Sequence, residues 1–135
     1  MKSSLQPGLS LVRCVTVEKE KTISFMGEEG RVYGTPFLIL DIEHTCRNLI
    51  LDHADPGEDS VGVEVAVKQL APTLPGSTVE ITVTVTAVEG RKVTFSVAAK
   101  DELDTISSGS HGRFVVDKAK TFERLKTKAA KLRGA

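Results

Sequence analysis

The stretch GTPFLILDIEHTC, residues 34–46, predicts the long helix on which the rest of the fold depends. Pro36 suits the first helical position, where its missing N–H costs nothing, and Thr35 suits the N-cap. Extended to about His53, the helix places a set of apolar residues on one face: Leu38, Ile39, Ile42, Cys46, Leu49 and Ile50. The opposite face carries polar residues that we expect in solvent: Asp41, Thr45, Asn48 and Asp52.

Strand-like segments follow this helix. The clearest, STVEITVTVTAVE at residues 77–89, alternates apolar residues with Thr and Glu, which is typical of a strand with one buried face. Glu89-Gly90 then indicates a hairpin. The remaining expected strands are residues 9–17, 60–71, 91–101 and 104–117.

Two further segments complete the order of elements. Residues 18–34 are charged and glycine-containing, and predict an irregular connection. From about Lys118, apolar residues at helical spacing predict an amphipathic tail helix. Antiparallel strands with one central helix indicate an α+β domain spanning residues 1–135. This is the layout of a hot-dog fold, in which a curved antiparallel sheet wraps around one helix, here with a C-terminal helix added.

Composition excludes several classes of function. The formal net charge is zero, which argues against nucleic acid or anionic membrane as partner. No apolar run approaches the roughly 18 residues of a membrane span, and the first residues lack the apolar core of a signal peptide. Cys14 and Cys46 fit free thiols of a cytoplasmic protein, with a single disulfide as the alternative. His44 and Cys46 lack a second ligand pair, so we expect no metal site.

Glu43 admits two interpretations. It lies at the edge of the apolar face, one turn before Arg47, and such a pair at i,i+4 stabilises a helix by a few tenths of a kcal/mol. A carboxylate beside apolar residues can instead serve as a base or nucleophile. Periodicity alone favours the ion pair.

A family resemblance changes this balance. The relevant features are the spacing from Thr35 to Glu43, the segment SVGVEVAV with Gly62, the segment VKQLAPTLPGSTVEITV, and the segment GSHGRFVV. Together they resemble the fluoroacetyl-CoA thioesterase family, a hot-dog branch that hydrolyses small acyl-CoA thioesters. The resemblance runs from the helix to the last strand. It implies a catalytic Thr, Glu and His, of which Thr35 and Glu43 match the first two.

The third position departs from the family, because Gln69 stands where the His is expected. Gln donates and accepts hydrogen bonds but cannot move a proton near pH 7. We expect Glu43 to act as base or nucleophile, and Thr35 and Gln69 to orient the thioester. The free N–H groups of the first helical turn would stabilise the negative oxygen. Pro36 has no N–H, so the candidate donors are Phe37 and its neighbours, or Gln69.

Three other residues are candidates for substrate binding. Gly62 lies inside a strand, where it either allows close approach of a substrate or marks a bulge. Arg113 matches an arginine that the family places near the substrate; the alternative is a surface charge. His111 shares its strand face and could replace the missing His.

Geometry predicts a homodimer. Eight residues of helix separate Thr35 from Glu43, a rise of about 12 Å, so a second chain should supply one of them. The resemblance to the thioesterase family implies an acyl-CoA thioesterase that acts on a small or medium acyl group without a cofactor. The alternative is a hot-dog protein that binds acyl-CoA without hydrolysing it.

Overall fold

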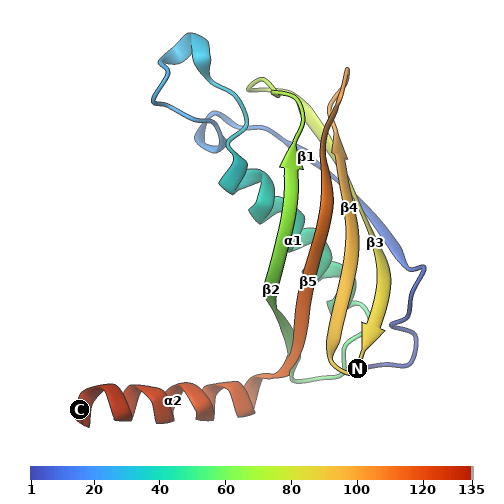
Figure 1. Cartoon of the computed structure of the whole chain (residues 1–135), viewed down its shortest axis with the longest axis vertical. Coiled ribbons are helices and arrows are strands. Elements are labelled where there is room, and N and C mark those ends of the chain that lie inside the picture. Colours follow the sequence, from blue (N-terminus) through green and yellow to red (C-terminus); the bar gives the residue numbers. More distant parts are fainter. Residues whose placement is uncertain (135) are drawn as a thin grey trace.

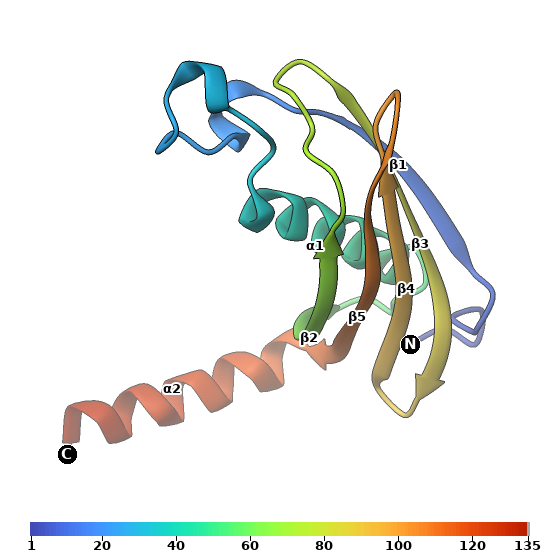
Figure 2. The ribbon, with the colours of Figure 1, turned by 45° about the horizontal axis from the view of Figure 1, so that its top comes forward.

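The computed structural model describes residues 1–134, in which five strands form one antiparallel sheet that curves around a helix (Figures 1 and 2). The strands are β1 (Ser10–Thr16), β2 (Glu58–Gln69), β3 (Thr78–Glu89), β4 (Lys92–Lys100) and β5 (Thr105–Asp117). The helices are α1 (Thr35–Leu51) and α2 (Lys118–Gly134), with two short 3₁₀ turns at Lys19–Lys21 and Glu28–Gly30. Every predicted strand is present, with ends within two residues of the prediction.

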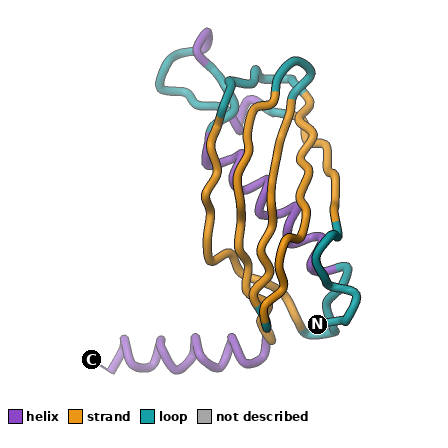
Figure 3. The backbone as a smooth tube through the Cα atoms, turned by 45° about the vertical axis from the view of Figure 1, so that its right-hand side comes forward, coloured by secondary structure: helices purple, strands orange, loops and turns teal. Residues whose placement is uncertain are grey.

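The strands lie side by side in one sheet (Figure 3), and their order across it is β1-β3-β4-β5-β2. All four neighbouring pairs are antiparallel, and β2 is an edge strand, paired on one side with β5. The pairing of β2 shifts register between Gly62 and Glu64, where Val63 forms a bulge. The hot-dog layout expected from the order of elements is confirmed.

The core lies between α1 and the inner face of the sheet. Helix α1 contributes Leu38, Ile42, Cys46, Leu49 and Ile50, and the facing strands contribute Ile81, Val83, Val85, Phe95, Val97 and Val115, all of them buried. Each such side chain contributes about 1.5–3 kcal/mol of transfer free energy. The apolar face of α1 thereby fixes how the helix is rotated, and so where Glu43 points.

Two polar residues of α1 that we expected in solvent are buried. Asp41 is 4% exposed because Lys21 Nζ lies 3.1 Å from each of its carboxylate oxygens and the Tyr33 hydroxyl donates a hydrogen bond to it. Thr45 is fully buried, and its hydroxyl donates to the Asp41 carbonyl oxygen at 2.7 Å. The connection before α1 therefore covers a face of the helix that its own periodicity marks as polar.

The start of α1 also differs from the prediction. Gly34 is the N-cap, and Thr35 is the first helical residue. The Thr35 hydroxyl does not cap the helix; it donates a hydrogen bond to Gln69 Oε1 instead. The side chain that we assigned to helix capping is thus free to take part in a site.

Helix α2 stands apart from the body. None of its described residues is buried, and it projects away from the sheet past the β2 edge (Figures 1 and 2). Within residues 1–134, neither helix combines the length and apolarity that crossing a bilayer requires.

Candidate functional site

Glu43 lies against the inner side of the edge strand. A Cβ placed on Gly62 would lie 2.6 Å from Glu43 Oε1, 3.2 Å from His111 Cε1 and 3.6 Å from Arg113 Nη1. These four residues come from α1, β2 and β5, and they were predicted as separate candidates. The structure brings them together, and the missing side chain at Gly62 provides the space for the Glu43 carboxylate.

His111 is held in one tautomer. Its Nδ1 lies 2.8 Å from the Glu64 carbonyl oxygen, which can only accept, so Nδ1 carries the proton. Its Nε2 lies 3.2 Å from Arg113 Nη1 and accepts from that guanidinium. Burial, together with Arg113, lowers the pKa of His111 and keeps the ring neutral. Because both ring nitrogens are engaged, His111 offers no free nitrogen for the proton transfer of the missing His.

Arg113 is not the surface charge that we weighed as an alternative, since only 5% of it is exposed. Its Nε donates to Ser60 Oγ at 2.7 Å, and its Nη2 donates to the Ser60 carbonyl oxygen at 2.8 Å. These bonds fix a positive group on the inner face, next to Glu43. Ser60 was not predicted as part of the site, and no sequence signal marks it.

The ion pair between Glu43 and Arg47, which helical periodicity alone favoured, is absent. Arg47 instead donates to Asp59, from Nε at 2.9 Å and from Nη2 at 2.7 Å. Among residues 1–134, no group donates a hydrogen bond to the half-buried Glu43 carboxylate. Its oxygens are therefore available to water or to a ligand.

A second polar group lies at the start of α1. Gln69 Nε2 donates to the Tyr33 carbonyl oxygen at 3.0 Å, which directs Oε1 toward the Thr35 hydroxyl. The Thr35 hydroxyl donates its proton to Gln69, and one amide N–H of Gln69 stays free. Tyr33 was not predicted to contribute; its role depends on its backbone carbonyl, which side-chain patterns do not reveal.

The backbone donors of the first turn are partly used. The Phe37 N–H donates to the Gly34 carbonyl oxygen at 3.0 Å, so Phe37 is not the free donor that we expected. Within the described chain, the Thr35 N–H has no acceptor. The free donors at this point are therefore the Thr35 N–H and the Gln69 amide.

Thr35 and Gln69 open into a cleft of about 450 Å³. Apart from these two and Tyr33, the lining residues are apolar: Ile23, Phe25, Val32, Leu70, Ala71 and Pro72. Ile23 and Phe25 belong to the irregular connection, which therefore forms one wall of the cleft. A mostly apolar cleft with a few converging polar groups is the usual form of a small-molecule site.

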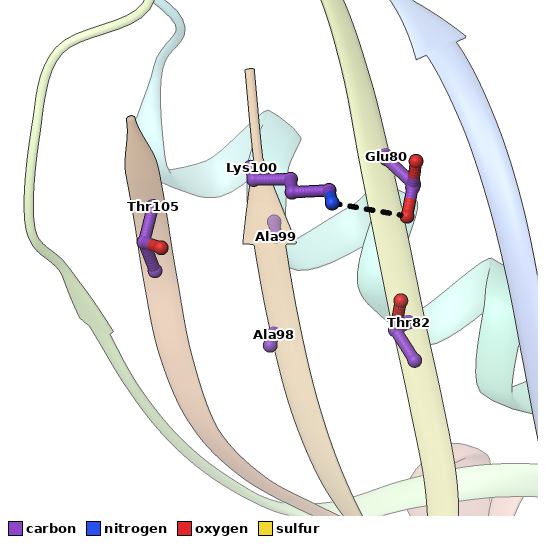
Figure 4. A pocket seen from close by; sticks show the side chains of 6 residues that line it. All are labelled: Glu80, Thr82, Ala98, Ala99, Lys100 and Thr105. Atoms are coloured by element: carbon purple, nitrogen blue, oxygen red, sulfur yellow. Dashed lines mark ion pairs between the residues drawn. The ribbon is translucent and has the colours of Figure 1, made fainter. Parts of the chain in front are cut away.

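Another pocket, of about 160 Å³, lies on the face of β3, β4 and β5 that points away from α1 (Figure 4). Glu80 and Lys100 pair across it at 3.7 Å, and its other lining residues are Thr and Ala. It lacks a converging catalytic set. The described residues hold no group of three His, Cys, Asp or Glu side chains placed to bind a metal ion, and Cys14 and Cys46 are free thiols.

The two polar groups are far apart within one chain. Eight helical residues separate Thr35 from Glu43, a rise of about 12 Å. Along β2, seven residues separate Gly62 from Gln69, or about 23 Å. A single chain thus contains two halves of a site, one with the carboxylate and one with the hydrogen-bond donors and the cleft.

Comparison with known proteins agrees with this layout. The family model of the fluoroacetyl-CoA-specific thioesterases matches residues 17–119. Fluoroacetyl-CoA thioesterase of Streptantibioticus cattleyicolor is 32% identical over 123 residues, which cover 86% of this chain and 88% of that protein.

Solved structures agree as well. A Thermus thermophilus hypothetical protein of the thioesterase superfamily superimposes with a TM-score of 0.87 at 27% identity, covering 96% of each chain. A mutant of the fluoroacetyl-CoA-specific thioesterase in complex with fluoroacetate and CoA gives a TM-score of 0.81 at 31% identity, covering 87% of this chain and 99% of that one. The fold is that of the hot-dog thioesterases. Within that class, the chain belongs to the fluoroacetyl-CoA-specific thioesterase family.

Proposed function

We propose that this protein hydrolyses acyl-CoA thioesters, with Glu43 as base or nucleophile and with Thr35 and Gln69 orienting the thioester. The observation that carries the proposal is the Glu43 carboxylate, which is half-buried beside Arg113 and His111 without a hydrogen-bond donor of its own. Family membership supports the reaction class, and a related structure in complex with CoA and fluoroacetate supports a CoA thioester as substrate.

The reaction needs two kinds of group. The thioester carbonyl oxygen becomes negative during attack and is stabilised by fixed N–H donors, here the Thr35 N–H and the free Gln69 amide. Glu43 either removes a proton from water as the water oxygen adds to the carbonyl carbon, or it attacks that carbon itself. The C–S bond then breaks, and the sulfur leaves as CoA thiol after taking a proton. If water attacked, the carboxylic acid is released directly. If Glu43 attacked, the acyl group stays on Glu43 as an anhydride, which water hydrolyses to release the acid and restore the carboxylate. Water and substrate suffice, so no cofactor enters the proposal.

Both halves of the site meet if two copies of the chain pair through β2. An unpaired edge strand offers free backbone N–H and C=O groups to a second copy. Antiparallel pairing about a two-fold axis reverses the strand, so the Gln69 end of one β2 lies beside the Gly62 region of the other. We propose a homodimer with two composite sites, each combining Glu43 of one chain with Thr35 and Gln69 of its partner.

The size and charge of the preferred acyl group can be inferred from the volume and lining of the cleft. A volume of about 450 Å³ with apolar walls at Ile23, Phe25 and Leu70 accommodates a small or medium acyl chain. No charged side chain lines it, so a neutral acyl group is favoured over a dicarboxylic one.

Hydrolysis of a graded series of acyl-CoA thioesters, from acetyl to palmitoyl, tests the proposed function. We expect turnover with a maximum at short or medium chains, followed as release of free thiol. Binding of CoA thioesters by a folded dimer without turnover on any of them would contradict the proposal. It would favour the non-catalytic alternative, for which the specific observation is a Gln69 that cannot titrate.

Complementation between two inactive variants tests the composite site. Glu43→Gln and Gln69→Leu are each expected to be inactive as homodimers. After unfolding and refolding as an equal mixture, half of the dimers are mixed, and each mixed dimer contains one intact site. We expect about a quarter of the wild-type activity to return, because sites combine residues of two chains. If the mixture stays as inactive as its parents, each chain uses its own Glu43 and Gln69.

A further inference from the structure

The zero net charge of the chain conceals a division between its two parts. Helix α2 carries seven Lys or Arg residues and one Glu, a formal charge of +6. The rest of the chain carries eleven basic and seventeen acidic residues, a formal charge of −6. Ten ion pairs are present in residues 1–134, and none of them joins α2 to the body. The helix and the body are therefore electrostatically complementary without being paired.

Helix α2 also exposes an apolar stripe made of Phe122, Leu125, Ala129 and Leu132. Its three large side chains are each more than half exposed. The members follow one another at intervals of three, four and three residues, which gives a narrow seam of the width that one protein surface buries. The stripe therefore favours a protein partner over a lipid surface.

The basic residues beside the stripe disfavour a second copy of α2 as the partner. Lys126, Lys128 and Arg133 flank the stripe on both sides, where paired helices normally place opposite charges. Two copies of α2 packed together would bring these like charges into contact. The favoured surface is therefore acidic and is not another α2.

The position of α2 indicates where such a surface lies. The helix leaves the end of β5 and runs past the unpaired edge strand β2 (Figures 1 and 2). Near this edge, Val61 and Val63 are 46% and 51% exposed. Seventeen helical residues span about 25 Å, or about five strand spacings, so α2 reaches across a sheet placed beside β2.

We propose that α2 is a docking arm that packs on the body of a second copy of this chain. The inference rests on the homodimer of the proposed function and adds an interface to it. The helix of one copy, with a formal charge of +6, contacts the body of the other copy, with a formal charge of −6. That body also covers the apolar stripe, at the edge where the two sheets pair. Helix α2 lies almost wholly outside the residues matched by the family model, so this interface is not required by the shared fold.

The test compares two full-length variants that add the same charge to opposite faces of α2. Leu125→Asp places a carboxylate in the stripe, whereas Thr127→Asp places one about 160° away around the helix. Both are measured by sedimentation over a dilution series, with circular dichroism to confirm equal helix content. We expect Leu125→Asp to raise the dimer dissociation constant at least about tenfold, and Thr127→Asp to change it less than about twofold.

Three outcomes would overturn the proposal. If wild type and Leu125→Asp have the same dimer dissociation constant, α2 has no docking role in the dimer, and the thioesterase proposal stays intact. If the wild type stays monomeric yet hydrolyses thioesters, both the docking of α2 on a second copy and the sites shared between two chains are contradicted. If Leu125→Asp leaves the dimer dissociation constant unchanged but abolishes binding to phosphatidylserine-containing vesicles, α2 would be assigned to a lipid surface instead. A wild type that dimerises and shows the expected effect of Leu125→Asp, but hydrolyses no thioester, would support the docking arm and contradict the proposed function alone.

Discussion

Replacing Glu43 with glutamine is expected to lower kcat/KM for thioester hydrolysis by a factor of about 10² to 10⁴, the usual contribution of a positioned base. Glutamine keeps the shape of the side chain but neither accepts a proton nor attacks a carbonyl carbon at neutral pH. Because no group in the described chain donates a hydrogen bond to this carboxylate, its loss should leave the fold intact. The measurement is steady-state hydrolysis of the preferred thioester, with the melting temperature recorded on the same sample.

The matched control is Glu89→Gln, which removes the same charge from an exposed position at the end of β3. It should leave kcat/KM within about twofold of wild type, because isolated surface charges contribute little. An active Glu43→Gln enzyme would mean that attack on the thioester depends on another group, and the proposed mechanism would fail. Equal losses in both variants would indicate a general effect of net charge rather than a role for Glu43.

The sequence predicts the elements well because their signals are local. Alternation of apolar residues with Thr and Glu marks β3, and the spacing of Leu38, Ile42 and Cys46 marks the buried face of α1. Each signal comes from one segment and from one buried surface. The candidate residues Glu43, Gly62, His111 and Arg113 were all named from the sequence, but their meeting at one place was not.

What the sequence does not predict depends on partners from elsewhere in the chain. Asp41 has the pattern of a solvent residue, yet Lys21 and Tyr33 reach it from the preceding connection. Arg47 has Glu43 at the favoured helical spacing, yet it pairs with Asp59 at the start of β2. Helical periodicity considers one segment at a time. It therefore cannot reveal hydrogen bonds and ion pairs to other segments, even where these outweigh the local ones.

The bulge in β2 is a further case, and it bears directly on the site. Strict alternation would place Gly62 and Glu64 on the same face of the sheet. The register shift at Val63 instead pairs Gly62 with Arg113 and Val65 with His111, so Gly62 and Val65 both face inward. Glu64 turns outward, where it pairs with Lys92. A strand sequence does not reveal where its register shifts, although the glycine next to the bulge was a hint.

Gly62→Ala is the second change with a large expected effect. The new Cβ would lie 2.6 Å from Glu43 Oε1, which is closer than real Cβ contacts come, and 3.2 Å from His111 Cε1, which is a tight contact. The flexible end of Glu43 moves most easily, so the carboxylate shifts while the fold is kept. A misplacement of about 1 Å can cost about 10²-fold in rate, and we expect kcat to fall by this order with KM little changed.

Gly112→Ala is the matched control, since it adds the same methyl group to β5, the strand that pairs with β2. There the nearest atoms lie at 3.4 Å, an ordinary contact, and kcat should stay within about twofold of wild type.

Combining Gly62→Ala with Glu43→Gln then separates the two roles considered for Gly62. If Gly62 acts through Glu43, the double variant is no slower than Glu43→Gln alone, because the carboxylate it positions is already gone. If the losses multiply, Gly62 serves the substrate directly by letting it approach the β2 backbone, and the space for Glu43 is incidental.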